Sequence, residues 1–129
     1  MIAIVSIFAF STELVVRNYE IHSDKINSNI MIAFLTDLHS CDYGEDQKEL
    51  LDCIKKQGPD IVLLGGDIAD DKFPHENWIT TIMALAEYYP CYYVSGNHEY
   101  WSSETEYIKQ TIREHGIYVL EGECRAIEI

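Results

Sequence analysis

Basic residues are scarce in this sequence of 129 residues. Lysine and arginine together number 9 against 22 aspartates and glutamates, so the formal net charge at pH 7 is −13. Because such a surface repels phosphate backbones, we expect no nonspecific nucleic-acid binding. A surplus of carboxylates is commonly a solvated face, but it can also supply oxygen ligands to divalent cations, and net charge does not decide between the two.

Closely paired cysteines are also missing. The four cysteines form no C-x-x-C pair and lie at positions 41, 53, 91 and 124. This spacing is not that of a structural zinc site. With 47% apolar residues, a single domain of this size can bury a core without disulfides. We therefore expect all four thiols to be reduced.

A hydrophobic run long enough to span a membrane is absent as well. The apolar stretch 1–10 is followed by Glu13 and Arg17, whereas a spanning helix needs about 20 apolar residues. No basic residue precedes the stretch and no small-residue cleavage site follows it, so a complete secretory signal is not supported. For residues 1–13 three alternatives stay open: the remnant of a membrane anchor, an interfacial helix or an extra buried strand. Localisation therefore stays open between the cytoplasm and a membrane-associated site.

What is present, in residues 14–129, is an alternation of apolar strands and amphipathic helices. Apolar, β-branched and aromatic runs predict strands at 14–22, 30–36, 61–64, 91–95 and 117–120, with one more after Gly122. Helical spacing and end signals predict helices from Asp46 to Gln57, from His75 to Tyr89, and from Ser103-x-x-Glu106 to His115-Gly116. Such alternation predicts βαβ units, and hence an α/β fold with a largely parallel sheet and flanking helices.

Polar residues that can bind metals follow three successive predicted strands. They are Asp37-Leu38-His39, Gly66-Asp67 and Gly96-Asn97-His98-Glu99. In a parallel sheet, ligands bind beyond the carboxyl ends of the strands. Each block alone is commonly turn chemistry, but three of them in order at the same sheet edge favour a metal site.

Each of these side chains suits a different task at such a site. In an extended segment Asp37 and His39 would lie on the same side and hold one cation. The two carboxylate oxygens of Asp67 can bridge two metals about 3.5 to 4 Å apart, and Asn97 offers an amide oxygen to the second. Mixed nitrogen and oxygen ligands suit Mn, Fe or Zn better than Ca. His98 is the candidate proton donor or charge stabiliser above the metals.

The remaining polar residues receive blander interpretations. Glu99 is given no role. The aspartates outside the three blocks are interpreted as loop and cap residues, and the other histidines as unlikely ligands: Asp42, Asp46, Asp70, Asp71, His22, His75 and His115.

The three blocks resemble the first three signature blocks of the calcineurin-like metallophosphoesterases. The blocks that carry the resemblance are Asp37-Leu38-His39, Gly65-Gly66-Asp67 and Gly96-Asn97-His98-Glu99, and the likeness covers roughly residues 30–120. It implies a four-layer αββα sandwich, of which this chain would form the N-terminal half. It also implies hydrolysis of a phosphoester substrate with two divalent metal ions, Mn, Fe or Zn.

The resemblance also implies individual roles. Asp37 and His39 would hold one metal, Asp67 would bridge both, Asn97 would hold the second, and His98 would assist the leaving group or the transition state. The family completes its site with a lone histidine and a G-H-x-H block from a C-terminal half, and neither occurs before the last residue. We therefore expect weak or no turnover from this chain alone.

A half domain would leave one apolar sheet face uncovered. The chain would then be a fragment, depend on a partner chain, or be a metal-poor relic. Two competing hypotheses stay open beside the hydrolase: a non-catalytic α/β module that binds a partner through this face, and a flavodoxin-like signalling domain with one acidic cation pocket. The last one predicts that His39 and His98 are dispensable for metal binding.

Overall fold

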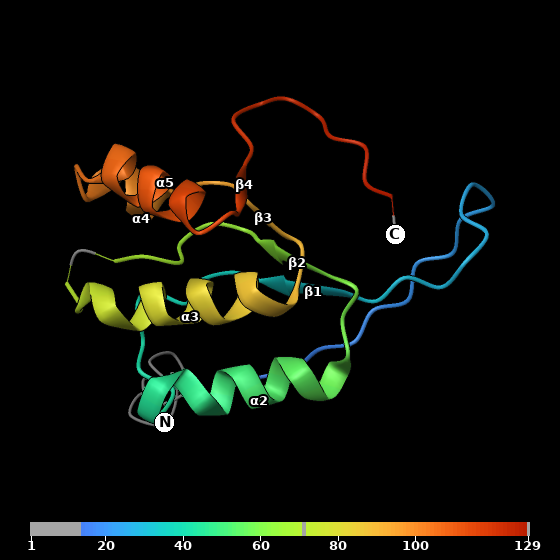
Figure 1. Ribbon diagram of the computed structural model, residues 1–129, viewed down its shortest axis with the longest axis horizontal. Helices are drawn as coiled ribbons and strands as arrows, with labels where there is room; N and C mark the ends of the chain where they lie inside the picture. Colours follow the sequence, from blue (N-terminus) through green and yellow to red (C-terminus); the bar gives the residue numbers. More distant parts are fainter. Residues whose placement is uncertain (1–13, 71, 129) are drawn as a thin grey trace, which may run out of the picture.

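The structure is a computed structural model that describes residues 14–70 and 72–128. The apolar segment 1–13 and its three alternatives lie outside these residues. Four parallel strands form one sheet in the order β1-β2-β3-β4 (Figure 1). They are β1 (Ile32–Leu35), β2 (Ile61–Leu64), β3 (Cys91–Tyr93) and β4 (Tyr118–Val119). The predicted α/β fold with a parallel sheet is confirmed.

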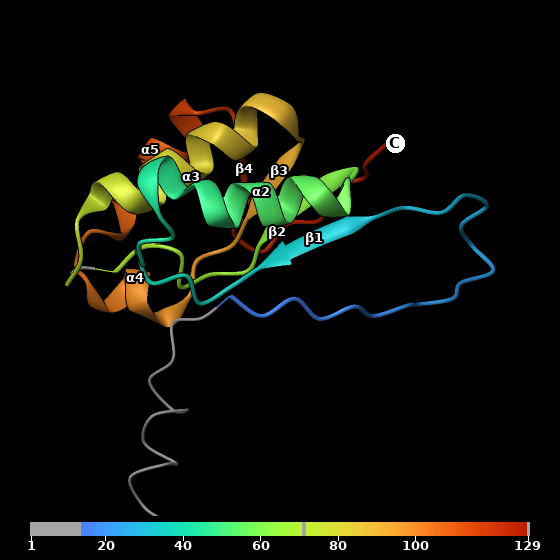
Figure 2. The same ribbon diagram turned by 90° about the horizontal axis from the view of Figure 1, so that it is seen from below.

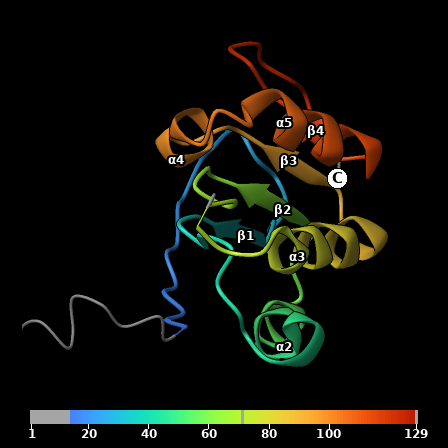
Figure 3. The ribbon, with the colours of Figure 1, turned by 90° about the vertical axis from the view of Figure 1, so that its left-hand side faces the viewer.

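Helices lie between successive strands. The long ones are α2 (Lys48–Gln57), α3 (His75–Tyr88) and α5 (Thr105–Glu114), and the short ones are a 3-10 turn η1 (Glu45–Gln47) and α4 (Asn97–Trp101). Figure 3 shows α5 beside β4 and α2 beside α3, away from β4. In Figure 2 the arrow of β1 points to the end of the molecule where α4 lies, so α4 stands beyond the carboxyl ends of the strands. Within the described residues, no helix has the length and apolar character needed to cross a bilayer.

One face of the sheet carries the hydrophobic core. Alternate strand residues such as Val62, Leu64 and Tyr93 are fully buried against Trp78 of α3 and Ile112 of α5. Because successive side chains of a strand point to opposite faces, these alternate residues all lie on one face of the sheet. Figure 2 shows the three long helices on that same side. This packing holds the strands in place, and with them the carboxyl ends at which the polar loops begin.

The opposite face is open at β1. Ile32 and Phe34 are 49% and 65% exposed, and residues 15–29 are exposed throughout. Towards β4 the same face is more covered, because Tyr92 stacks on Tyr118 with ring centroids 5.3 Å apart. The sheet thus has an exposed apolar region at one edge, as expected of a half domain.

Two predicted strands and two predicted helix starts are wrong. Residues 14–22 and 121–128 form no strand in the described part of the chain, because β propensity has no effect where the segment lies exposed without a neighbouring strand. Asp46 does not cap a helix. It lies within η1 with a non-helical φ of 52°, and α2 begins only at Lys48. The cap predicted at Ser103 is likewise one residue early, because Ser103 has a φ of 62° and Glu104 precedes the first residue of α5, Thr105. Gly58, with a φ of 62°, ends α2 as predicted.

The cysteines give a direct test of the packing. All four are free, and burial raises the pKa of the Cys91 thiol to about 12, whereas Cys124 is exposed. Because the thiolate is the reactive form, we expect iodoacetamide at pH 8 to label Cys124 in the native protein and Cys91 only after unfolding. Peptide mass spectrometry with and without urea measures both. Equal labelling of the two thiols in the native protein would contradict this packing.

Candidate metal centre

The loops that follow β1 and β2 run side by side beyond the sheet. The amides of Asp37, His39 and Ser40 donate hydrogen bonds to the carbonyls of Gly66, Asp67 and Ile68, at 3.2, 2.9 and 2.9 Å. Left-handed backbones recur in these loops, with φ of 58° at Asp37, 47° at His39 and 53° at Asp67. The predicted extended alternation of Asp37 and His39 is therefore wrong. Their side chains still lie close, with 3.8 Å between Asp37 Oδ1 and His39 Nε2, because the hydrogen bonds to the loop after β2 fix the backbone of the loop after β1.

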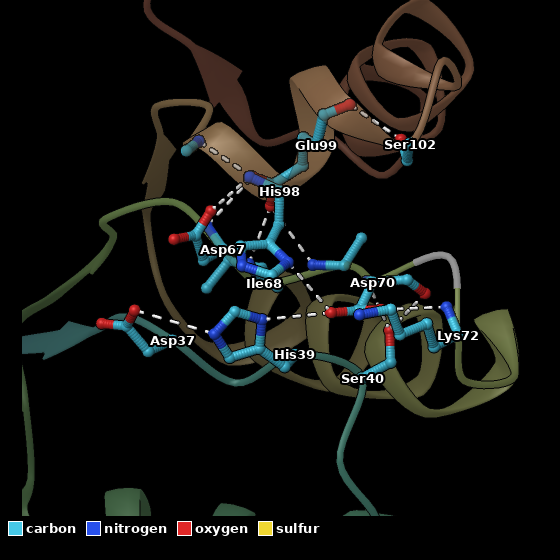
Figure 4. A network of polar contacts seen from close by, with 12 residues as sticks. Asp37, His39, Ser40, Asp67, Ile68, Asp70, Lys72, His98, Glu99 and Ser102 are labelled. Atoms are coloured by element: carbon cyan, nitrogen blue, oxygen red, sulfur yellow. Dashed lines mark hydrogen bonds and ion pairs between the residues drawn. The ribbon is translucent and has the colours of Figure 1, made fainter.

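Three of the predicted site residues converge at this end of the sheet. His39, Asp67 and His98 each offer a ligand atom, and these atoms lie within 4.8 Å of one another. The rings of His39 and His98 meet edge to face with centroids 4.4 Å apart (Figure 4). All three side chains are half-buried, so a small ion could reach them while most of the bulk water is excluded. One carboxylate with two imidazoles suits a divalent transition metal.

The chemistry of His39 supports this interpretation. Its Nδ1 is buried and has no hydrogen-bond partner in the described part of the protein, although it lies 3.3 Å from Oδ2 of Asp70. That distance fits an ion pair, but the angle does not fit a hydrogen bond. A buried polar atom without a partner costs folding free energy unless a ligand or ion binds there. The residues therefore fit a metal whose binding would orient this ring.

Asp70 is a member of the site that the sequence interpretation missed. Its side chain is only 5% exposed, and Oδ2 lies 3.1 Å from Nδ1 of His98 as well as close to His39. Burial acts to raise the pKa of Asp70, but a hydrogen bond from the Lys72 amide and the charges of His98, His39 and Lys72 outweigh it, so the pKa is lowered. The ionised carboxylate can only accept, so Nδ1 of His98 donates. Nε2 of that ring is then left free as a ligand or a proton carrier.

A sequence signal for Asp70 existed in its neighbours. It follows Ile68 and Ala69, which are 0% and 1% exposed, so the segment after Asp67 enters the core and does not form a solvated loop. The amide of Asp70 also donates to Ser40 Oγ at 2.9 Å. Glu99, which received no role, is fully buried and accepts hydrogen bonds from backbone amides on both sides of the site.

The other two predicted ligands border the group. Asp37 has a side chain that is 63% exposed and accepts a hydrogen bond from Thr36 Oγ1 at 2.9 Å. Asn97 is exposed at the first position of α4, directly before His98. The amide of His98 donates to Asp67 Oδ1 at 2.9 Å, which ties α4 to the loop after β2. The individual ligand and catalytic roles stay predictions.

Comparisons with known proteins show the family to which the chain is similar. The family model described as calcineurin-like phosphoesterase matches residues 30–125. The uncharacterized metallophosphoesterase YkoQ of Bacillus subtilis is 32% identical over 102 residues, which are 75% of this chain and 38% of that protein. The uncharacterized metallophosphoesterase Cj0846 of Campylobacter jejuni is 27% identical over 107 residues, which are 78% of this chain and 27% of that protein.

No solved structure gives a significant match. The match to each of the two relatives covers less than two fifths of that relative's length. The matched region contains all three polar blocks and every strand of the sheet. On the strength of that match, the chain belongs to the calcineurin-like phosphoesterase family.

Proposed function

We propose that this chain carries the N-terminal part of a binuclear, metal-dependent phosphoester hydrolase. The observation that carries the proposal is the convergence of His39, Asp67 and His98, from the loops after β1 and β2 and from helix α4, at the carboxyl end of a parallel sheet. The family match supports the reaction class. Mn²⁺, Fe or Zn²⁺ suits such a mixed donor set.

In this proposal each residue has a defined task. Asp37 and His39 would hold one ion, Asp67 would serve both ions, and Asn97 would contribute its amide oxygen to the second. When bound, divalent ions supply Lewis acidity toward the phosphoryl oxygens and lower the pKa of a water nucleophile. His98 receives orientation from Asp70 through Nδ1, and its Nε2 carries a proton toward the departing oxygen.

A second candidate function rests on the open sheet face. Ile32 and Phe34 are exposed side by side on β1, and an apolar surface of this kind is typical of an interaction site. The partner would be a chain that completes the sandwich, either with catalysis or without it. Size-exclusion chromatography together with metal analysis distinguishes the two, because a monomer that binds metal favours the hydrolase and a partner-dependent species without metal favours the interaction module.

The decisive experiment is a titration of the 129-residue chain with Mn²⁺ by calorimetry. We expect wild-type binding, and we expect Asp67→Asn to lower the affinity by at least the roughly tenfold loss that even outer-shell substitutions cause. Asp52→Asn is the matched control, because its side chain is 62% exposed on α2. Turnover of bis(4-nitrophenyl) phosphate is followed in parallel, and we expect little from the chain alone.

The proposal fails if the wild-type chain binds no Mn²⁺, or if Asp67→Asn binds it as well as Asp52→Asn does. Equal metal binding after replacement of His39 would instead favour the acidic cation pocket of a signalling domain.

A further inference from the structure

We infer that Glu99 is the positioning residue of the metal centre, which it serves by fixing the loop that carries Asp67 to the start of helix α4, which carries His98. This inference rests on the proposed function. Glu99 would touch neither metal nor substrate and would act only through the backbone.

The contacts of Glu99 join two segments far apart in sequence. Oε1 accepts hydrogen bonds from the amides of Ile68 and Ala69 at 2.7 and 3.2 Å. Oε2 accepts from the amides of Asp67 and Gly96 at 3.0 and 2.9 Å. One carboxylate therefore satisfies four backbone donors, three in the loop after β2 and one at the start of α4.

Because Glu99 is buried, its carboxylate depends on these hydrogen bonds. The residue is 0% exposed, and within the described residues no basic side chain forms an ion pair with it. A buried carboxylate needs full hydrogen bonding to remain stable. Backbone amides provide that here, so the charge is held in place by the same segments that it orders.

The segment that Glu99 orders needs such support. Asp67 has a φ of 53°, a left-handed conformation that aspartate adopts more readily than most residues but that still needs support from hydrogen bonds around it. The amide of Asp67 is bonded to Glu99, while its Oδ1 accepts from the amide of His98. The orientation of Asp67 relative to His98 therefore depends on Glu99, although Glu99 lies outside the group of ligand atoms.

Glu99→Gln tests this inference. Glutamine keeps one acceptor oxygen but turns an NH₂ group toward amide donors, so about half of the bonds are lost. We expect Mn²⁺ affinity to fall about tenfold, as for other outer-shell substitutions. In the metal-free protein we expect hydrogen exchange at the amides of Asp67, Ile68 and Ala69 to accelerate at least about tenfold, because these amides lose their acceptor.

Two controls separate positioning from general stability. Glu87→Gln makes the same chemical change at an exposed position of α3. Ile112→Val destabilises the core, where Ile112 is 0% exposed, and should leave Mn²⁺ affinity within about twofold because it is remote from the loops. Should Glu99→Gln fail to fold, Glu99→Asp keeps both oxygens on a shorter stem and gives the same two readings.

The possible results are distinct. If Mn²⁺ does not bind the wild-type chain, the proposed function fails, and the exchange rates alone decide on Glu99. The positioning role is overturned if exchange at these three amides and Mn²⁺ affinity both match the Ile112→Val control.

Discussion

Replacement of Gly96 by alanine should remove most Mn²⁺ binding and lower the free energy of unfolding. A Cβ at this position would lie 2.5 Å from the backbone nitrogen of Asp67 and closer still to Asp67 Oδ1. Its φ of −92° suits alanine, so the effect is purely steric. Overpacking of this kind costs about 1–3 kcal/mol, and displacement of Asp67 should reduce metal affinity about 10- to 100-fold.

Urea unfolding and calorimetric titration measure these two effects separately. Gly116→Ala is a suitable control, because Gly116 has a φ of +80° and nothing within 4 Å of an added Cβ. That substitution should cost about 1–2 kcal/mol through backbone strain alone, with Mn²⁺ affinity unchanged. Wild-type affinity in Gly96→Ala would show that the two loops can separate without disturbing the centre.

Asp70→Asn should weaken Mn²⁺ binding toward the upper end of the roughly 10- to 100-fold range seen for residues that orient metal ligands. Asp70 Oδ2 faces Nδ1 of both His39 and His98, at 3.3 and 3.1 Å. An asparagine would present an NH₂ group or a neutral oxygen there, so His98 Nδ1 would lose its charged acceptor and His39 Nδ1 the negative charge beside it. The ring orientation and tautomer that leave Nε2 free would then be lost.

The measurement is again calorimetric, with Asp52→Asn as the exposed control of identical chemistry. A complementary reading comes from NMR of the imidazole nitrogens, which reports the tautomer of His98 directly. If Asp70→Asn binds Mn²⁺ like the control and keeps the tautomer of His98, Asp70 is only a loop residue, as the sequence interpretation had it.

The sequence predicted the layout of the sheet well, because that layout depends on local patterns. Ile61–Leu64 is a continuous apolar run, and Gly58 ends the preceding helix where expected. Parallel strands joined by helices bring their carboxyl ends to one edge, so the convergence of His39 and His98 follows from topology. The strand at 14–22 was wrong because strand formation requires a neighbour, which a local pattern does not contain.

The supporting residues of the site were harder to predict. Glu99 and Asp70 act through backbone amides and imidazoles that come close only after folding, and a carboxylate in a loop has the same local signature whether it is solvated or buried. Asn97 begins a short helix, α4, although an extended loop was expected. The left-handed backbone at His39 was also not predictable, since even histidine, which is enriched there, adopts this conformation in only a small share of its occurrences.

The position of β1 has a practical consequence for anyone who purifies this chain. Among the described residues its outer edge pairs with no strand, and such an edge beside exposed Phe34 is a template for strand addition between molecules. The surplus of carboxylates keeps molecules apart at neutral pH. Solubility should therefore be lowest near the sequence pI of about 4.5, where that repulsion vanishes and colloidal association, not melting, would limit the useful concentration.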